Sequence, residues 1–241
     1  MTRRLEAAFP RAILQPMPHQ RFRERAFTLL ELLAVLAICT ALATLGLGVG
    51  GRALKEADKA DSVARLRTLG NAIHLYAGEH DQALPGPLWP GQVMEYDPAR
   101  DGRIVRDLAP YLDIAHRDAP YLVQRMIPNA YRRNPPSGRM TDLRIYVVNA
   151  SIMLEGQTVT PFGTLITAST GETVKTSDPL RLNRLDKLPG NERWMLSETD
   201  QKHPSVAAAP WRASTPALPL HDGFRAVLNF DGSANLERVN P

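Results

Sequence analysis

The stretch RAFTLLELLAVLAICTALATLGLGVGG, residues 25–51, decides how this chain is organised. From Phe27 to Gly51 it holds 25 residues with only one charged side chain, Glu31. As a helix this segment would span about 37 Å, which exceeds the ~30 Å hydrocarbon core of a bilayer. It therefore predicts a transmembrane helix at residues 27–51. A carboxylate in such a helix costs about 2.5 to 3.5 kcal/mol on insertion scales, so Glu31 needs a function that offsets this cost.

The positive charge of the chain is concentrated before this helix. The formal net charge is +4, and residues 1–26 alone contain six arginines and two glutamates, so the remainder is neutral. Arginines on one side of an apolar helix place that side in the cytoplasm, with residue 52 onward across the membrane. A neutral remainder argues against nucleic acid as a partner. The single cysteine, Cys39, permits no intramolecular disulfide and is expected to face lipid.

Two kinds of export signal begin with a basic leader and an apolar run. A secretory signal peptide would be cut after a small-x-small site such as Ala41-Leu42-Ala43 and release a soluble protein that starts at Thr44. The length of the apolar run and the carboxylate of Glu31 within it argue against this alternative.

The second kind is carried by Ala26-Phe27-Thr28-Leu29-Leu30-Glu31-Leu32-Leu33, which resembles the class III signal of type IV pilins and type II secretion pseudopilins. The resemblance implies cleavage between Ala26 and Phe27 by a prepilin peptidase, followed by N-methylation of Phe27. Glu31 is then the fifth residue of the mature chain, and its implied role is to pair with the Phe27 amine of a neighbouring subunit during assembly. A glutamate that snorkels to the headgroups is the alternative.

Two features of the leader bear on this resemblance. The family usually has glycine before the cut, where this chain has Ala26. The leader begins at Met1, and a start at Met17 would leave a ten-residue leader of the commoner length.

The segment after the apolar run keeps a helical pattern. Apolar residues spaced by three or four form one stripe, which predicts a single long helix from Phe27 to Glu79; the stripe consists of Val63, Leu66, Leu69, Ile73 and Tyr76. Residues 52–80 are expected to be its periplasmic half, packed on a head formed by residues 81–241.

The head is expected to be α+β, because helical and loop segments precede the strand patterns. Short helices are predicted near 104–112 and 120–126. Strands are predicted at 143–149, 158–160, 164–167 and 193–197. Together these elements predict a long N-terminal helix packed on an antiparallel β-sheet, and the resemblance implies that this is a pilin-like fold.

The C-terminal segment predicts a hairpin over residues 224–239. Phe224, Ala226, Leu228 and Phe230 alternate with other residues, and Asp231-Gly232 is typical of a type I′ turn. His221, nine intervening residues and Asp231-Gly232 resemble the H-x9-DG element of one large group of pilin-like proteins. Residues 66–85 resemble the segment after the membrane helix in the same group.

The sequence contains no recognisable catalytic, metal-binding or cofactor-binding motif. His74 and His80 would lie on different faces of a helix, and Ser62, Ser151 and Ser197 have no nucleophile context. His221, near Asp222 and Asp231, fits a structural hydrogen bond better than a metal ligand, because further ligands cannot be identified. The pair Glu192 and Glu198 cannot be told from surface carboxylates. We therefore expect no enzymatic activity, no metal and no cofactor.

The resemblance implies a pseudopilin or minor pilin that polymerises into a periplasmic fibre of a type II secretion or type IV pilus-like machine. Its partners would be the prepilin peptidase, other pilin or pseudopilin subunits and the inner-membrane assembly platform. It would be a single-pass inner-membrane protein with its head in the periplasm. The alternative is a membrane-tethered or secreted ligand-binding module that does not polymerise.

Overall fold

The computed structural model describes residues 27–136, 140–185 and 187–239, without the side chains of residues 45–49 and 191. The chain divides into two units, residues 1–48 and 49–241. Helix α1, Leu29–Glu79, belongs to both. It ends at the predicted residue and begins two residues after the predicted start.

The apolar stripe predicted on the second half of α1 is confirmed. Leu66, Leu69 and Ile73 are fully buried, and Val63 and Tyr76 are partly buried against the same core. The spacing of three and four residues keeps these side chains on one face, which the head covers.

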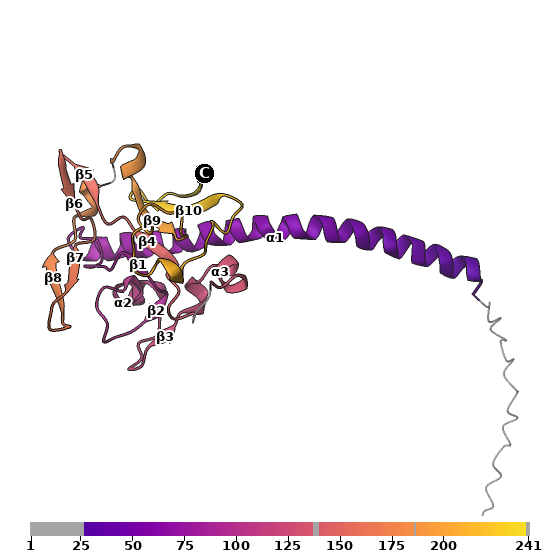
Figure 1. The fold of residues 1–241 in the computed structure, drawn as a ribbon, viewed down its shortest axis with the longest axis horizontal. Coiled ribbons are helices and arrows are strands. Elements are labelled where there is room, and N and C mark those ends of the chain that lie inside the picture. Colours follow the sequence, from indigo (N-terminus) through magenta and orange to yellow (C-terminus); the bar gives the residue numbers. More distant parts are fainter. Residues whose placement is uncertain (1–26, 137–139, 186, 240–241) are drawn as a thin grey trace, which may run out of the picture. The chain divides into compact units, whose positions relative to one another are not determined.

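The main sheet of the head has five strands in the order β1-β4-β9-β10-β11, and every neighbouring pair is antiparallel. Figure 1 shows β4, β9 and β10 beside the C-terminal part of α1, and their side chains share one core with it. The α+β class with an antiparallel sheet on the long helix is therefore confirmed. The strands are β1 Gly91–Gln92, β4 Tyr146–Val148, β9 Trp194–Glu198, β10 Phe224–Asn229 and β11 Ala234–Arg238.

Three two-stranded sheets and short helices complete the head. The strands are β2 Glu95–Tyr96 with β3 Tyr121–Leu122, β5 Ile152–Leu154 with β6 Gln157–Val159, and β7 Thr164–Thr167 with β8 Thr173–Ser177. The helices are α2 Ile104–Asp107, α3 Asn129–Arg133 and the 3₁₀ turns η1 Ala109–Leu112, η2 Gln124–Met126, η3 Leu182–Arg184, η4 Gly190–Glu192 and η5 Arg212–Ser214.

Most of the predicted segments are found, with shifted ends. β7 has the predicted bounds, and α2 with η1 fills the helix predicted over 104–112. The helix predicted over 120–126 is wrong in its first half, because Tyr121–Leu122 pairs with β2 as a strand.

The outer face of the main sheet is covered, which the alternation in β10 did not predict. Val227 and Asn229, on the face opposite Ala226 and Leu228, are 4% and 1% exposed. The segment after β9 lies on this face at Val227, since Asp200 forms an ion pair with Arg225 and His203 lines the same cavity as Val227. The Asn229 side chain bonds within its own hairpin, where its amide donates to Ser233 Oγ at 3.0 Å. Both faces of β10 are therefore in the interior.

His203 makes the free energy of unfolding depend on pH. Its side chain is buried, its ring lies 5.5 Å from that of Trp194, and its Nδ1 accepts the Ser205 N–H at 3.1 Å. Burial, helped by the Arg225 charge, lowers the pKa of His203 to about 4. In the unfolded chain this residue takes up a proton near its ordinary pKa of about 6.5. The stability that the neutral, buried His203 contributes is therefore fully present above that pH and is lost as the pH falls toward 4.

We predict that His203→Asn removes this loss, which amounts to at most about 3 kcal/mol. The measurement is the free energy of unfolding between pH 7 and pH 4, as the difference between wild type and variant. The difference is needed because burial raises the pKa of Asp107 to about 6, which shifts stability in the opposite direction in both proteins. Parallel pH curves for the two proteins would contradict the role of His203.

Candidate functional site

The start of α1 is a capping box built by Thr28 and Glu31. The Glu31 Oε2 accepts the Thr28 backbone N–H at 2.9 Å and the Thr28 hydroxyl at 3.0 Å, and the Glu31 N–H donates to Thr28 Oγ1 at 3.2 Å. These bonds satisfy backbone donors that have no partner inside the helix. Glu31 thus has a local role in capping α1, and its assembly role stays a prediction.

The pattern Thr28-x-x-Glu31 is a capping-box signature that can be recognised in the sequence. Its recognition would have identified Thr28 as the N-cap residue and placed the helix start at Leu29. Both hydrogen bonds that Thr28 donates, from its backbone N–H and from its hydroxyl, go to Oε2 of Glu31. Among the described residues no hydrogen bond goes to Oε1. One carboxylate oxygen of Glu31 is therefore available to a second partner.

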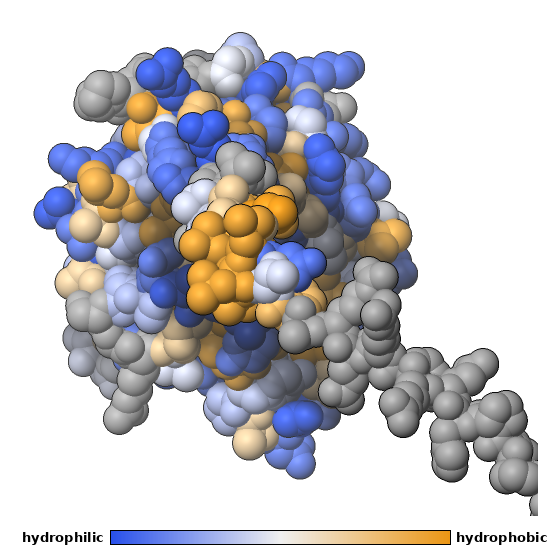
Figure 2. Space-filling view, turned by 90° about the vertical axis from the view of Figure 1, so that its right-hand side faces the viewer, coloured by the Kyte–Doolittle hydropathy of each residue, from blue (hydrophilic) through white to orange (hydrophobic). Residues whose placement is uncertain are grey.

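The N-terminal unit exposes its apolar side chains on all sides of α1. They are between 48% and 82% exposed, and Figure 2 looks onto this end of the chain, where they appear in orange. They are Phe27, Leu29, Leu30, Leu32, Leu33, Val35, Leu36, Ile38 and Leu42. Soluble proteins rarely leave a continuous apolar surface of this kind uncovered, so it indicates contact with lipid or with other chains. Cys39 is also exposed there.

The predicted processing site is only partly described. Phe27 lies just before α1 and is 73% exposed, whereas Ala26 and the basic leader lie outside the described residues. Among the residues that the structure describes, none of the helices is sufficiently long and apolar to span a bilayer.

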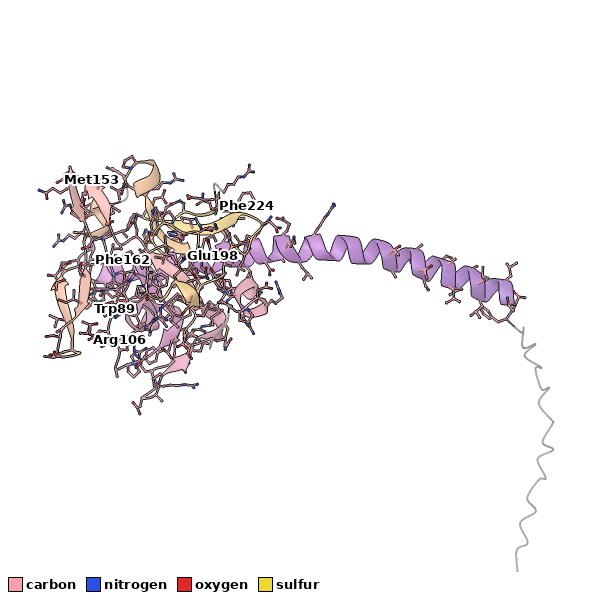
Figure 3. The ribbon with its side chains drawn as sticks, in the orientation of Figure 1. Trp89, Arg106, Met153, Phe162, Glu198 and Phe224 are labelled. Atoms are coloured by element: carbon pink, nitrogen blue, oxygen red, sulfur yellow. The ribbon has the colours of Figure 1, made fainter. Side chains whose placement is uncertain are left out.

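At the C-terminal element, His221 joins the helix to the sheet. Its Nε2 lies 3.0 Å from Ser62 Oγ on α1 and 3.1 Å from Glu198 Oε2 on β9. All three residues are at most 3% exposed. Glu198 also accepts the Ala226 N–H of β10 at 3.0 Å; Figure 3 labels Glu198 near α1. The expected structural hydrogen bond of His221 is confirmed, and its partners, Ser62 and Glu198, were not identified from the sequence.

A serine, a histidine and a glutamate together resemble a hydrolase triad, but the geometry differs from one. In a catalytic relay the serine and the carboxylate meet opposite nitrogens of the imidazole. Here both meet Nε2, while Nδ1 is buried with no partner among the described residues. We assign this cluster to the attachment of the sheet to the helix.

The turn after β10 differs from the predicted type I′ turn. That turn needs positive φ at both Asp231 and Gly232, but only Gly232 has it, at 81°. The loop closes through the Gly232 N–H to Asn229 O at 3.0 Å and the Asn229 N–H to Ser233 O at 2.8 Å. This is a three-residue hairpin loop with glycine in the left-handed position.

Two consecutive residues with positive φ occur instead between β5 and β6, at Glu155 and Gly156.

Asp231 has another role in its own loop, because its Oδ1 accepts the Ser233 N–H at 2.8 Å and the Ser233 hydroxyl at 2.6 Å. These bonds lower the pKa of Asp231 and hold the chain as it enters β11.

The spacing of the H-x9-DG element has a physical explanation in the contact between β10 and α1. Its first residue meets the helix at Ser62, and its glycine meets the helix at His74, whose ring lies 3.1 Å from the position of a Cβ on Gly232. Between these ends, Leu228 packs on Gly70, where a Cβ would lie 2.8 Å from its Cδ1.

The helix residues in these contacts belong to one ridge. Ser62, Leu66, Gly70 and His74 follow each other at intervals of four, and such residues line up on one face of a helix. The segment from His221 to Gly232, which contains β10, therefore follows about 18 Å of α1 and contacts the helix at both of its ends.

The remaining candidate residues are not gathered into a site. The Nδ1–H of His74 donates to Gly70 O within α1 at 2.8 Å, and His80 stacks on Tyr76 at 3.9 Å between ring centroids. Glu192 accepts the Met153 N–H, whereas Glu198 is buried at His221. In the described ranges no group of three or more possible metal ligands comes together.

The comparisons with known proteins identify the N-terminal segment. Residues 21–47 match the family described as the prokaryotic N-terminal methylation motif. This match supports the resemblance to type IV pilins and pseudopilins, and it covers the processing junction, the capping box and most of the exposed apolar run. No curated protein and no solved structure matched the chain.

A pair of helix glycines tests the packing of β10 on α1. We predict that Gly78→Ala, in open space on the same helix, raises the free energy of unfolding by up to about 1 kcal/mol through helix propensity. Gly70→Ala should lower it, because the new methyl overlaps Leu228 and overpacking costs about 1 to 3 kcal/mol.

Chemical denaturation of the full chain in detergent measures both variants. Shortening the partner in Gly70→Ala/Leu228→Val should recover part of the loss. If Gly70→Ala stabilises the protein as much as Gly78→Ala does, β10 does not pack on this ridge.

Proposed function

We propose that this protein is a pseudopilin or minor pilin, processed by a prepilin peptidase and assembled through α1 into a periplasmic fibre. The observation that carries the proposal is the coincidence of three features within residues 21–47. They are the methylation motif, the Thr28–Glu31 capping box and the exposed apolar side chains that follow. A soluble head alone requires none of the three.

The proposed location rests on the sequence and the methylation motif. Residues 27–51 would cross the inner membrane once, with the arginine-rich leader in the cytoplasm and the head in the periplasm. The prepilin peptidase and the assembly platform of a type II secretion or type IV pilus-like machine would be the partners on the membrane side. Other pilin-like subunits would replace lipid around α1 when the fibre forms.

The proposed assembly role of Glu31 is compatible with its capping role. Oε2 is used by Thr28, and Oε1 is available for the Phe27 amine of a neighbouring subunit. A charge-assisted hydrogen bond of this kind would offset two charges that are each costly in an apolar environment. The bond would also fix the axial offset between two subunits, because the amine and the carboxylate lie one helical turn apart in each chain.

The proposed function predicts how the amino terminus is processed. When the chain is expressed with a prepilin peptidase, mass spectrometry of the mature protein should find N-methylated Phe27 at its amino terminus. Ala26→Gly should leave the product unchanged and increase the processed fraction, because it restores the residue usual in the family. An amino terminus at Thr44 would instead support a secreted, non-polymerising module and exclude the proposed fibre subunit.

A set of three variants separates the two roles of Glu31. Glu31→Gln keeps an acceptor for the capping box and removes the charge. Thr28→Val removes the capping hydroxyl and keeps the charge. Glu31→Leu removes both the acceptor and the charge.

If pairing with the neighbour's amine is required, Glu31→Gln and Glu31→Leu should both fail to enter fibres, while Thr28→Val is incorporated. Membrane insertion of Glu31→Leu should be as good as that of wild type or better, since it removes the cost of the carboxylate. The measurement is the amount of each variant in sheared fibres and in isolated membranes. Normal incorporation of Glu31→Gln would reduce Glu31 to a helix cap and contradict the pairing.

A further inference from the structure

A groove on the head, lined by no residue of α1, brings together two tryptophans and three arginines. The cavity has a volume of about 810 Å³, a size typical of a ligand site. Its lining includes Trp89, Trp211, Arg100, Arg103 and Arg144; Figure 3 labels Trp89. None of these residues has a part in the proposed assembly through α1.

Arg103 is the unusual residue of this groove. It is only 5% exposed, and its Nε has no hydrogen-bond partner among the described residues. Burial, together with the charges of Arg144 and Arg100, lowers its pKa to about 10. A buried guanidinium normally has its donors satisfied, so Arg103 costs the fold stability that a ligand carrying negative charge would restore.

The backbone around Arg103 is held rigidly by Gln92, which is fully buried. The Gln92 side chain donates to Gly102 O at 3.1 Å and to Trp89 O, and it accepts the Ile104 N–H at 2.8 Å. These bonds fasten both residues next to Arg103 in the chain to β1. The guanidinium is thereby presented by a fixed loop, which lowers the entropy cost of binding.

The two indoles lie over glycines, so their positions are also fixed. A Cβ on Gly102 would lie 2.5 Å from Trp89 Cδ1, and a Cβ on Gly91 would lie 2.8 Å from Trp211 Cε2. Only glycine permits this approach, and both tryptophans remain partly exposed. They offer flat apolar surfaces next to the guanidinium groups.

The carboxylates of the groove narrow the class of ligand. Asp97, Asp101 and Glu172 also line it, so a polyanion such as a nucleic acid or polyphosphate would meet repulsion along with the arginines. A saccharide has hydroxyls that donate to carboxylates, C–H faces that pack on indoles and, in a uronic acid, one carboxylate for arginine.

We propose that this groove binds an acidic saccharide, with a uronic acid carboxylate held by Arg103 and Arg144 and the sugar rings against Trp89 and Trp211. One buried guanidinium whose Nε has no partner among the described residues faces the same groove as two exposed carboxylates, Asp101 and Glu172. This combination matches one acid group among many hydroxyls. This role does not depend on polymerisation, so it holds for a fibre subunit and for a tethered module alike.

The test is titration calorimetry of the full chain in detergent, at physiological salt, with a galacturonic acid trimer. The galactose trimer obtained by reducing its carboxyl groups and inorganic phosphate are the comparison probes. We expect the acidic trimer to bind at least about tenfold more tightly than the neutral one, the contribution of one charge-assisted hydrogen bond. Phosphate should bind more weakly than the acidic trimer.

Variants identify the groove as the site. Arg144→Gln and Arg103→Met should each weaken binding of the acidic trimer by about tenfold and leave the neutral trimer unchanged. Trp211→Ala should weaken both trimers. Arg212→Gln, at the exposed neighbour of Trp211, is the matched control and should bind as wild type does.

Thermal melts separate a binding role of Arg103 from a structural one. If its guanidinium is kept for a ligand, Arg103→Met should melt at the wild-type temperature or above it. Equal affinity for the two trimers, tighter binding of phosphate, the absence of binding, or a lower melting temperature of Arg103→Met would each overturn the proposal.

Discussion

The contact of β10 with one ridge of α1 is the constraint on which the head depends. The ridge carries a small polar residue at Ser62, a glycine at Gly70 and a histidine at His74; β10 packs on Gly70, and the turns before and after β10 contact the other two. With β10 fixed in this way, β9 and β11 pair on its two sides. The six residues of β10 extend about 20 Å at ~3.3 Å per residue, which matches the about 18 Å of helix between Ser62 and His74. The other residues of the H-x9-DG element form the turns on either side of the strand.

Burial of the Ser62–His221–Glu198 cluster makes this contact specific in register. Glu198 bonds to both His221 and the Ala226 N–H, so the sheet and the helix meet at one carboxylate. A shift of β10 by one residue would leave these polar groups buried without partners. Apolar contacts such as Leu228 on Gly70 supply the packing, and the polar cluster selects one arrangement.

Sequence patterns predicted the parts of this structure that depend on local periodicity. The end of α1, its buried stripe and the hairpin at the C-terminus follow from spacings of three, four and two residues. The capping box was also readable from Thr28-x-x-Glu31. The turn type at Asp231-Gly232 was not, because a two-residue and a three-residue loop can carry the same pair.

Features formed by distant segments could not be read in this way. The partners of His221 lie on α1 and β9. The groove between Trp89 and Trp211 is assembled from residues near 89–103, Arg144 and Trp211. No spacing in the sequence relates these segments. The burial of Val227 was missed for the same reason, since His203, which lines the same cavity, belongs to the segment after β9.

The central functional claim is that the apolar surface of α1 is covered by lipid before assembly and by other subunits after it. A photoreactive amino acid at Leu36, which is 57% exposed, reports directly on what covers this surface. We expect adducts with lipid in membranes that lack the assembly machinery, and adducts with the α1 segment of another pilin-like subunit when the machinery is present. Adducts with neither lipid nor another subunit under both conditions would contradict this claim.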